Sequence, residues 1–222
     1  MLKKLLLASA LALGLATTQA NAAEFTLSQA FGTGNFGTMT GVFLANGTTA
    51  EITIDMSPNA ILDTGNGHIA LGISLAGGTI DASTLDALNP GLPAGTYSVL
   101  PHVSPASYNN SPFGLWTDGI AGACGSGSSS GGCGSTLVFD ILNFQGFLPA
   151  TNTFGSPPVN VFASVDIYLS PEGPTGAVGL GAAPTITTHS VPGPIAGAGL
   201  PGLIVACSGL LALARRRRRQ PV

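Results

Sequence analysis

Residues 51–56 read Glu-Ile-Thr-Ile-Asp-Met, in which polar and apolar residues alternate strictly. This period of two is typical of a β-strand with one face in a core. Residues 42–45 form a second short apolar run, and the dipeptide Asn46-Gly47, which adopts the positive φ of a hairpin turn, lies between the two runs. The stretch therefore predicts an antiparallel β-hairpin.

Similar short runs recur along the middle of the chain, separated by Gly, Pro and Asn. The clearest are residues 68–75, 96–100, 136–143 and 160–169. Long helices find little support, since residues 81–88 allow only a turn or two before Asn89-Pro90. The pattern predicts an all-β domain over residues 23–190, folded as a two-sheet antiparallel β-sandwich.

All seven basic residues lie near the ends of the chain, and all ten acidic residues lie between them. The basic residues are Lys3, Lys4, Arg215, Arg216, Arg217, Arg218 and Arg219. A middle region without Lys or Arg cannot neutralise phosphates, which excludes nucleic acid as a partner. Anionic lipid and acidic polysaccharide would be repelled for the same reason.

The first 22 residues have the layout of a secretory signal peptide. Lys3 and Lys4 precede an apolar run, and small residues follow as far as Ala22. We therefore expect the export translocon to deliver the chain and cleavage to fall between Ala22 and Ala23.

Residues 195–214 form a stretch of 20 residues without a charge. A helix of that length, at about 1.5 Å per residue, spans the ~30 Å hydrocarbon core of a membrane. The arginines at 215–219 follow at once and would stay in the cytoplasm as a stop-transfer flank. The sequence thus predicts one C-terminal transmembrane helix and an inner-membrane-anchored precursor.

Val191, Pro192, Gly193 and Pro194 stand immediately before this apolar span. Motif, span and basic cluster, in that order over residues 191–222, resemble the C-terminal sorting signal of PEP-CTERM proteins, which Gram-negative bacteria export and an exosortase processes. The family motif typically has a glutamate where this chain has Gly193. The resemblance implies cleavage by an exosortase-like enzyme near the motif and a final location on the outer surface or outside the cell. A plain membrane anchor is the alternative.

Cys124 and Cys133 bracket residues 125–132, which consist only of Gly and Ser. In an oxidising compartment these two cysteines predict a disulfide. Closing a loop of about 10 residues would stabilise the fold by roughly 2.7 kcal/mol in the chain-entropy model.

Patterns for catalysis and metal binding are incomplete. Residues 63–65 read Asp-Thr-Gly, the local motif of aspartic proteases, but the second such motif that supplies the partner carboxylate is absent. The three histidines, His68, His102 and His189, show no spacing for zinc or a serine triad. The acidic stretch 81–86 lacks the calcium-loop pattern. No catalytic residue, metal or cofactor is predicted.

These observations predict a non-enzymatic exported protein of the cell surface or extracellular matrix, and the PEP-CTERM resemblance implies an association with exopolysaccharide or biofilm. One alternative is a neutral-glycan-binding or adhesive module, in which exposed aromatic side chains would contact a neutral polysaccharide. The aromatic candidates are Trp116, Tyr97, Tyr108 and Tyr168. The third possibility is a secreted hydrolase.

Overall fold

The computed structural model describes residues 22–28, 34–63, 69–110, 112–123, 133–151, 159–169 and 175–188. The chain divides into two compact units, Met1–Thr188 and His189–Val222, and all described residues belong to the first. The predicted signal peptide up to residue 21, the sorting motif, the transmembrane helix and the arginine cluster lie outside the described residues and stay predictions. No helix in the described ranges combines the length and apolar character needed to cross a membrane.

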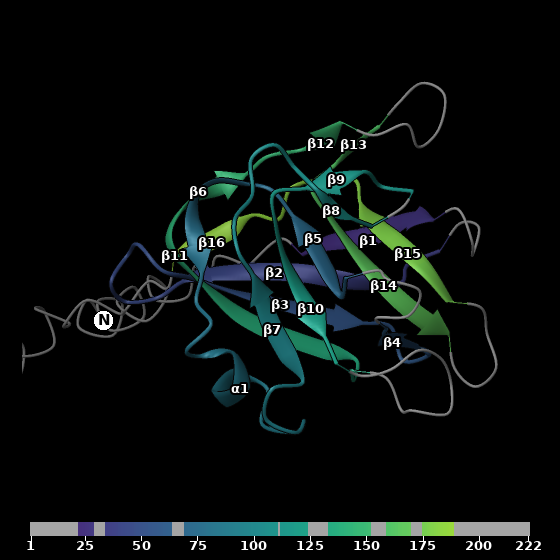
Figure 1. The fold of residues 1–222 in the computed structure, drawn as a ribbon, viewed down its shortest axis with the longest axis horizontal. Coiled ribbons are helices and arrows are strands. Elements are labelled where there is room, and N and C mark those ends of the chain that lie inside the picture. Colours follow the sequence, from purple (N-terminus) through teal and green to yellow (C-terminus); the bar gives the residue numbers. More distant parts are fainter. Residues whose placement is uncertain are drawn as a thin grey trace, which may run out of the picture. The chain divides into compact units, whose positions relative to one another are not determined.

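The described chain is almost entirely β-structure (Figure 1). Its short helix, α1, spans Leu85–Leu88, where a turn or two was expected. The strands are β1 (Ala23–Ser28), β2 (Gly37–Phe43), β3 (Ala50–Met56), β4 (Ala60–Leu62), β5 (Leu71–Ile73), β6 (Leu75–Ile80), β7 (Tyr97–Leu100), β8 (Tyr108–Asn109), β9 (Leu115–Trp116), β10 (Asp118–Gly122), β11 (Thr136–Phe147), β12 (Ala150–Thr151), β13 (Asn160–Val161), β14 (Ala163–Leu169), β15 (Thr175–Leu180) and β16 (Ile186–Thr188).

In the described part of the chain, twelve strands form one continuous sheet in the order β6-β11-β3-β2-β1-β15-β14-β5-β10-β7, with β16 paired to β2 and β4 paired to β14. The pairing of β16 with β2 is parallel, and the other recorded pairings are antiparallel. The prediction of an antiparallel all-β domain is confirmed.

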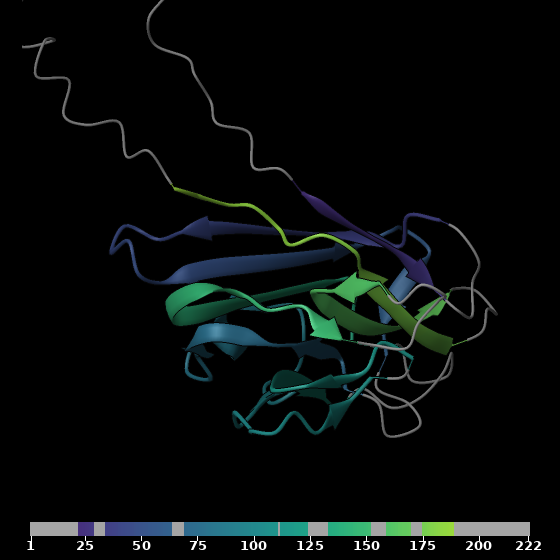
Figure 2. The ribbon, with the colours of Figure 1, turned by 90° about the horizontal axis from the view of Figure 1, so that it is seen from above.

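The prediction of two separate sheets is wrong, because the sheet is barrel-like and β1 joins its two halves. Ala23 and Glu24 pair with β2, and the rest of β1 pairs with β15 after an irregularity between Phe25 and Leu27. Such a break in register bends a strand and increases its twist. The two halves thereby curl around a shared core (Figure 2).

The hairpin predicted around Asn46-Gly47 is confirmed, since β2 and β3 pair along their whole length. The connection is longer than a two-residue turn. Oδ1 of Asn46 accepts hydrogen bonds from the backbone N–H groups of Thr48 and Thr49, at 3.0 and 2.8 Å. Gly47 has a φ of 70°, a conformation that glycine adopts without steric cost.

The alternation in residues 51–56 works as predicted, because Ile52, Ile54 and Met56 are buried between the halves of the sheet. The largest fully buried side chains of this main core also include Phe25, Met39, Leu62, Leu71, Ile73, Ile120, Leu137 and Phe139.

A second, smaller cluster lies apart from this core and contains Phe113 and Trp116, both fully buried. The aromatic rings lie against sheet glycines. An added Cβ on Gly72 would come within 2.3 Å of the Trp116 ring, and one on Gly179 within 2.9 Å of the Phe113 ring. Strand β14 is accordingly buried at every position from Ala163 to Tyr168, on both faces of the sheet.

Candidate functional site

The two ends of the strand order, β6 and β7, are not paired with each other in the described chain. Residues from both strands line a cavity of about 190 Å³, which we call the seam pocket. Its lining residues are Thr79, Ile80, Val99, Leu100, Pro101, His102 and Asp118. The place where the curled sheet ends therefore holds a small cavity with two ionisable side chains.

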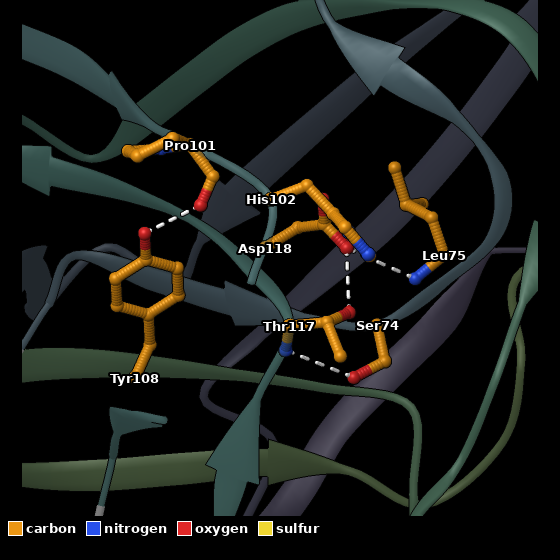
Figure 3. Close-up of polar contacts among 7 residues, drawn as sticks. All are labelled: Ser74, Leu75, Pro101, His102, Tyr108, Thr117 and Asp118. Carbon is orange, nitrogen blue, oxygen red and sulfur yellow. Dashed lines mark hydrogen bonds and ion pairs between the residues drawn. The ribbon is translucent and has the colours of Figure 1, made fainter. Parts of the chain in front are cut away.

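His102 and Asp118 are hydrogen-bonded to each other at the seam pocket (Figure 3), with 3.0 Å between Nδ1 of the imidazole and Oδ1 of the carboxylate. His102 comes two residues after the end of β7, and Asp118 is the first residue of β10. The two strands are antiparallel neighbours, with Gly119 opposite Leu100. This pairing brings together two residues that lie 16 positions apart.

The carboxylate of Asp118 is buried, with 4% of its side chain exposed, whereas the side chain of His102 is 52% exposed. Oδ2 of Asp118 accepts hydrogen bonds from Oγ1 of Thr117 at 2.6 Å and from the backbone N–H of Leu75 at 3.3 Å. A buried carboxylate is tolerated when such donors replace its water. Several hydrogen bonds therefore fix Asp118, and the carboxylate in turn orients the imidazole.

His102 is the one side chain in the described ranges that can become positively charged, because Lys and Arg are absent there. An imidazole held through Nδ1 by a carboxylate presents Nε2 as a proton acceptor or hydrogen-bonding group. Within the described residues, no hydroxyl or thiol hydrogen-bonds to Nε2. The geometry provides an oriented base or ligand-binding group, and none of the residues that the structure describes places a nucleophile on it.

A larger cavity of about 330 Å³ lies between the end of α1 and the start of β11, lined by residues 88–92 and 133–136. Beside it, the hydroxyl of Tyr97 donates a hydrogen bond of 2.6 Å to the carbonyl of Cys133. Burial raises the pKa of the Tyr97 phenol well above its ordinary value. The hydroxyl therefore stays a donor up to alkaline pH.

The site residues predicted from the sequence fall mostly outside the described ranges. Ala22 is exposed, and Ala23 is the buried first residue of β1. Cys133 is buried and disulfide-bonded. Its predicted partner Cys124 lies outside the described residues, as do Val191, Pro192, Gly193, Pro194 and the five arginines, so these assignments stay predictions.

Two acidic residues were considered above as part of a protease motif or a calcium loop, and in the structure both take part in hydrogen bonding. Asp63 is 1% exposed at the end of β4, and its backbone N–H donates to the carbonyl of Asp166 at 2.9 Å. Asp81 accepts hydrogen bonds from the backbone N–H and hydroxyl of Ser83, at 2.8 and 2.6 Å. The described residues contain no group of three or more His, Cys, Asp or Glu side chains that could hold a metal ion.

The expectation that the aromatic candidates for glycan binding are exposed is wrong for three of the four. Trp116 is fully buried, and Tyr97 and Tyr168 are 5% and 6% exposed. Tyr108 is partly exposed, and its hydroxyl donates to the carbonyl of Pro101 beside His102 (Figure 3). Trp116 is buried in the second, smaller cluster, and Tyr97 is buried in the main core. Residue type alone does not reveal either position.

The His102–Asp118 pair is the feature that sequence reasoning missed. No motif joins the two residues, since their proximity depends on the register of β7 against β10. The sequence did contain one signal, the charge pattern, because histidine is the only residue type in the acidic domain whose side chain can become positively charged, and the domain has three of them.

Comparisons of the chain with known protein families, with curated proteins and with solved structures find no match. No relative therefore supplies a function or a site for this chain.

Proposed function

We propose that the chain is a non-enzymatic exported protein of the cell surface or extracellular matrix, associated with exopolysaccharide or biofilm. In this proposal a PEP-CTERM-like tail sorts it and an exosortase-like enzyme removes that tail. The observation that carries the proposal is the separation of charge: the seven basic residues flank two apolar segments near the ends, and residues 23–190 contain none. Basic flanks beside apolar segments are what the export and membrane machinery recognises.

The strand boundaries support the proposed processing. Strand β1 begins at Ala23, directly after the proposed signal cleavage, and β16 ends at Thr188, shortly before the motif at Val191. Cleavage at either point would remove none of the described strands. The disulfide-bonded state of Cys133 agrees with an oxidising compartment outside the cytoplasm.

The test is mass spectrometry of the intact protein from its native host. We expect a chain that begins at Ala23 and lacks the arginines at 215–219. A chain that retains these arginines would replace the exosortase-type processing by a plain membrane anchor. Retention of residues 1–22 would show that the protein is not exported through a cleaved signal.

A secreted hydrolase is the second candidate, and the His102–Asp118 pair favours it, because a histidine oriented by a buried carboxylate is the arrangement of a general base. Purified protein is assayed for hydrolysis of ester, peptide and glycan polymers beside His102→Gln and the matched pocket variant Thr79→Ser. The non-enzymatic proposal expects no turnover that depends on His102. Hydrolysis lost in His102→Gln and kept in Thr79→Ser would establish the hydrolase instead.

A further inference from the structure

The first and last strands of the described chain, β1 and β16, share one edge of β2. The other edge of β2 pairs with β3 over its full length. On the shared edge, β1 pairs with Thr38 and Met39, and β16 pairs in parallel with residues 41–43. Figure 2 shows the purple first strand and the yellow-green end of the described chain beside the blue strands β2 and β3. Strand β16 thus occupies the part of the edge that β1 leaves open.

Gly41 makes a hole in this edge, and Ile186 of β16 fills it. A Cβ added to Gly41 would lie 2.2 Å from Cδ1 of Ile186 and 2.9 Å from Cδ1 of the buried Ile52. Gly41 is not among the residues with positive φ, so space rather than backbone conformation requires the glycine. Ile186 packs against the main core through this hole, and Oγ1 of Thr187 donates a hydrogen bond of 3.4 Å to the Gly41 carbonyl. We call residues 41–43 with this hole the β16 seat.

The strand in the seat is held by few contacts. It has three residues, Ile186 and Thr187 are half-buried, and Thr188 is exposed. Its one strand partner in the described chain is β2. The connection from β15, residues 181–185, is exposed except at Pro184. Withdrawal of β16 would therefore break one short pairing and leave the rest of the sheet bonded.

The seat and its strand contain no charged residue, although residues 23–190 carry ten acidic side chains. Residues 23–190 contain no Lys or Arg, so two copies of this domain have no such side chain with which to attract each other's carboxylates. Main-chain hydrogen bonds and an apolar anchor can still join them, which is how an added strand binds to a sheet edge. The β16 seat offers both.

We propose that the β16 seat also binds β16 of a second copy of this chain, so that copies assemble by strand exchange. An exchanged β16 makes the same contacts with β2 as the chain's own β16. The balance between the two states therefore depends on protein concentration and on the connection 181–185, rather than on new contacts. Crowding at a surface favours exchange, because it raises the local concentration. The inference rests on β2 and β16 alone and is independent of how the chain is processed.

The test uses disulfide trapping between two full-length chains. Val42 and Thr187 are opposite each other in the parallel pairing. A Val42→Cys chain is mixed at high concentration with a Thr187→Cys chain and oxidised. Each chain oxidised alone gives the background, which includes dimers through the native cysteines and through two identical introduced cysteines. We expect a covalent dimer in the mixture, at least tenfold above that background. Adding Gly41→Val to the Val42→Cys chain should abolish this excess, because the valine side chain fills the hole.

A chain that carries both Val42→Cys and Thr187→Cys provides the reference for docking within one molecule. If this chain cross-links internally while the mixture stays at background, β16 does not exchange and the proposal is wrong. If neither cross-links, the seat itself is wrong. Should circular dichroism show that Gly41→Val misfolds, Ile186→Ser in the Thr187→Cys chain takes its place, since it removes the anchor without adding bulk to the sheet. Dimer yield unaffected by Ile186→Ser would also overturn the proposal.

Discussion

Trp116 provides a quantitative test of the packing in the second, smaller cluster. The indole is fully buried, and Gly72 of β5 lies directly against it. An added Cβ on Gly72 would stand 2.3 Å from Cδ1 and 2.7 Å from Cγ and Nε1 of the ring. Because these atoms belong to a rigid ring inside a packed cluster, a small rotation does not relieve the overlap.

The magnitudes follow from this packing. Trp116→Ala is expected to lower the free energy of unfolding by about 3–5 kcal/mol, the range for removing a large buried aromatic side chain. Gly72→Ala alone is expected to cost about 1–3 kcal/mol through overpacking. In the Trp116→Ala background the same glycine substitution should cost almost nothing, because the ring that it would meet is gone. The double-mutant cycle therefore predicts a coupling energy of about 1–3 kcal/mol.

The assay is urea unfolding followed by far-ultraviolet circular dichroism under oxidising conditions. Leu115→Ala is the matched control, since Leu115 is the adjacent residue and is 51% exposed. Its effect should stay within about 0.5 kcal/mol. Trp116 is the single tryptophan of the chain, so the intrinsic fluorescence of the unsubstituted protein also reports the burial of this one ring.

Two results would refute the reasoning. If Gly72→Ala cost the same with and without the indole, the ring would not lie against β5. If Trp116→Ala were as mild as Leu115→Ala, Trp116 would be a surface residue, and its use in glycan binding would again be open.

Three further substitutions test buried polar groups by urea unfolding. Burial and the nearby charge of Asp81 raise the pKa of the Asp140 carboxyl, so the folded state loses stability as pH rises through the range where the unfolded carboxyl ionises. Asp140→Asn should therefore raise the free energy of unfolding at pH 7 by about 0.2–1 kcal/mol and give no such gain near pH 3. A larger gain at pH 3 than at pH 7 would contradict a raised pKa of Asp140 in the folded state. Tyr97→Phe should lower the free energy of unfolding by about 1–3 kcal/mol, because the Cys133 carbonyl loses its hydrogen-bond donor. Since burial raises the pKa of Tyr97, the difference in stability between the two proteins should shrink above pH ~10. A difference that stays the same above this pH would contradict the burial of the phenol. Asn89→Ala should lower the free energy of unfolding by about 2–3 kcal/mol, because the Asn89 amide makes three hydrogen bonds to backbone groups, at 2.6, 2.8 and 3.0 Å. A loss below about 0.5 kcal/mol would show that these hydrogen bonds are absent in solution.

Local pattern was sufficient for much of the secondary structure. The alternation in residues 51–56 identifies the buried face of β3, and Asn46-Gly47 marks the hairpin before it. The predicted runs 96–100 and 136–143 overlap β7 and β11. These features depend on residues that are close together in the chain, so they can be predicted from one sequence alone.

The seam pocket and the β16 seat could not be predicted in this way. His102 and Asp118 meet through the pairing of β7 with β10, and Ile186 reaches Gly41 from 145 positions further along the chain. Neither pair has a motif. The pairing register of distant strands decides which side chains share a site. An alternating pattern of polar and apolar residues fixes which face of each strand is buried but leaves several registers possible.

The sequence by itself determined the β character of the domain, the separation of its charges and the expectation of two processed ends. Periodicity and charge act over neighbouring residues or over the whole composition, and both can be read directly along the chain. Only the tertiary structure decided that twelve of the described strands join in one curled sheet, that Trp116 lies inside, and that a histidine meets a buried aspartate at the seam. The first depends on β1 passing from one half of the sheet to the other. The second depends on the packing of the Trp116 ring against Gly72, and the third on the pairing of β7 with β10, and all three bring together residues that the sequence does not relate.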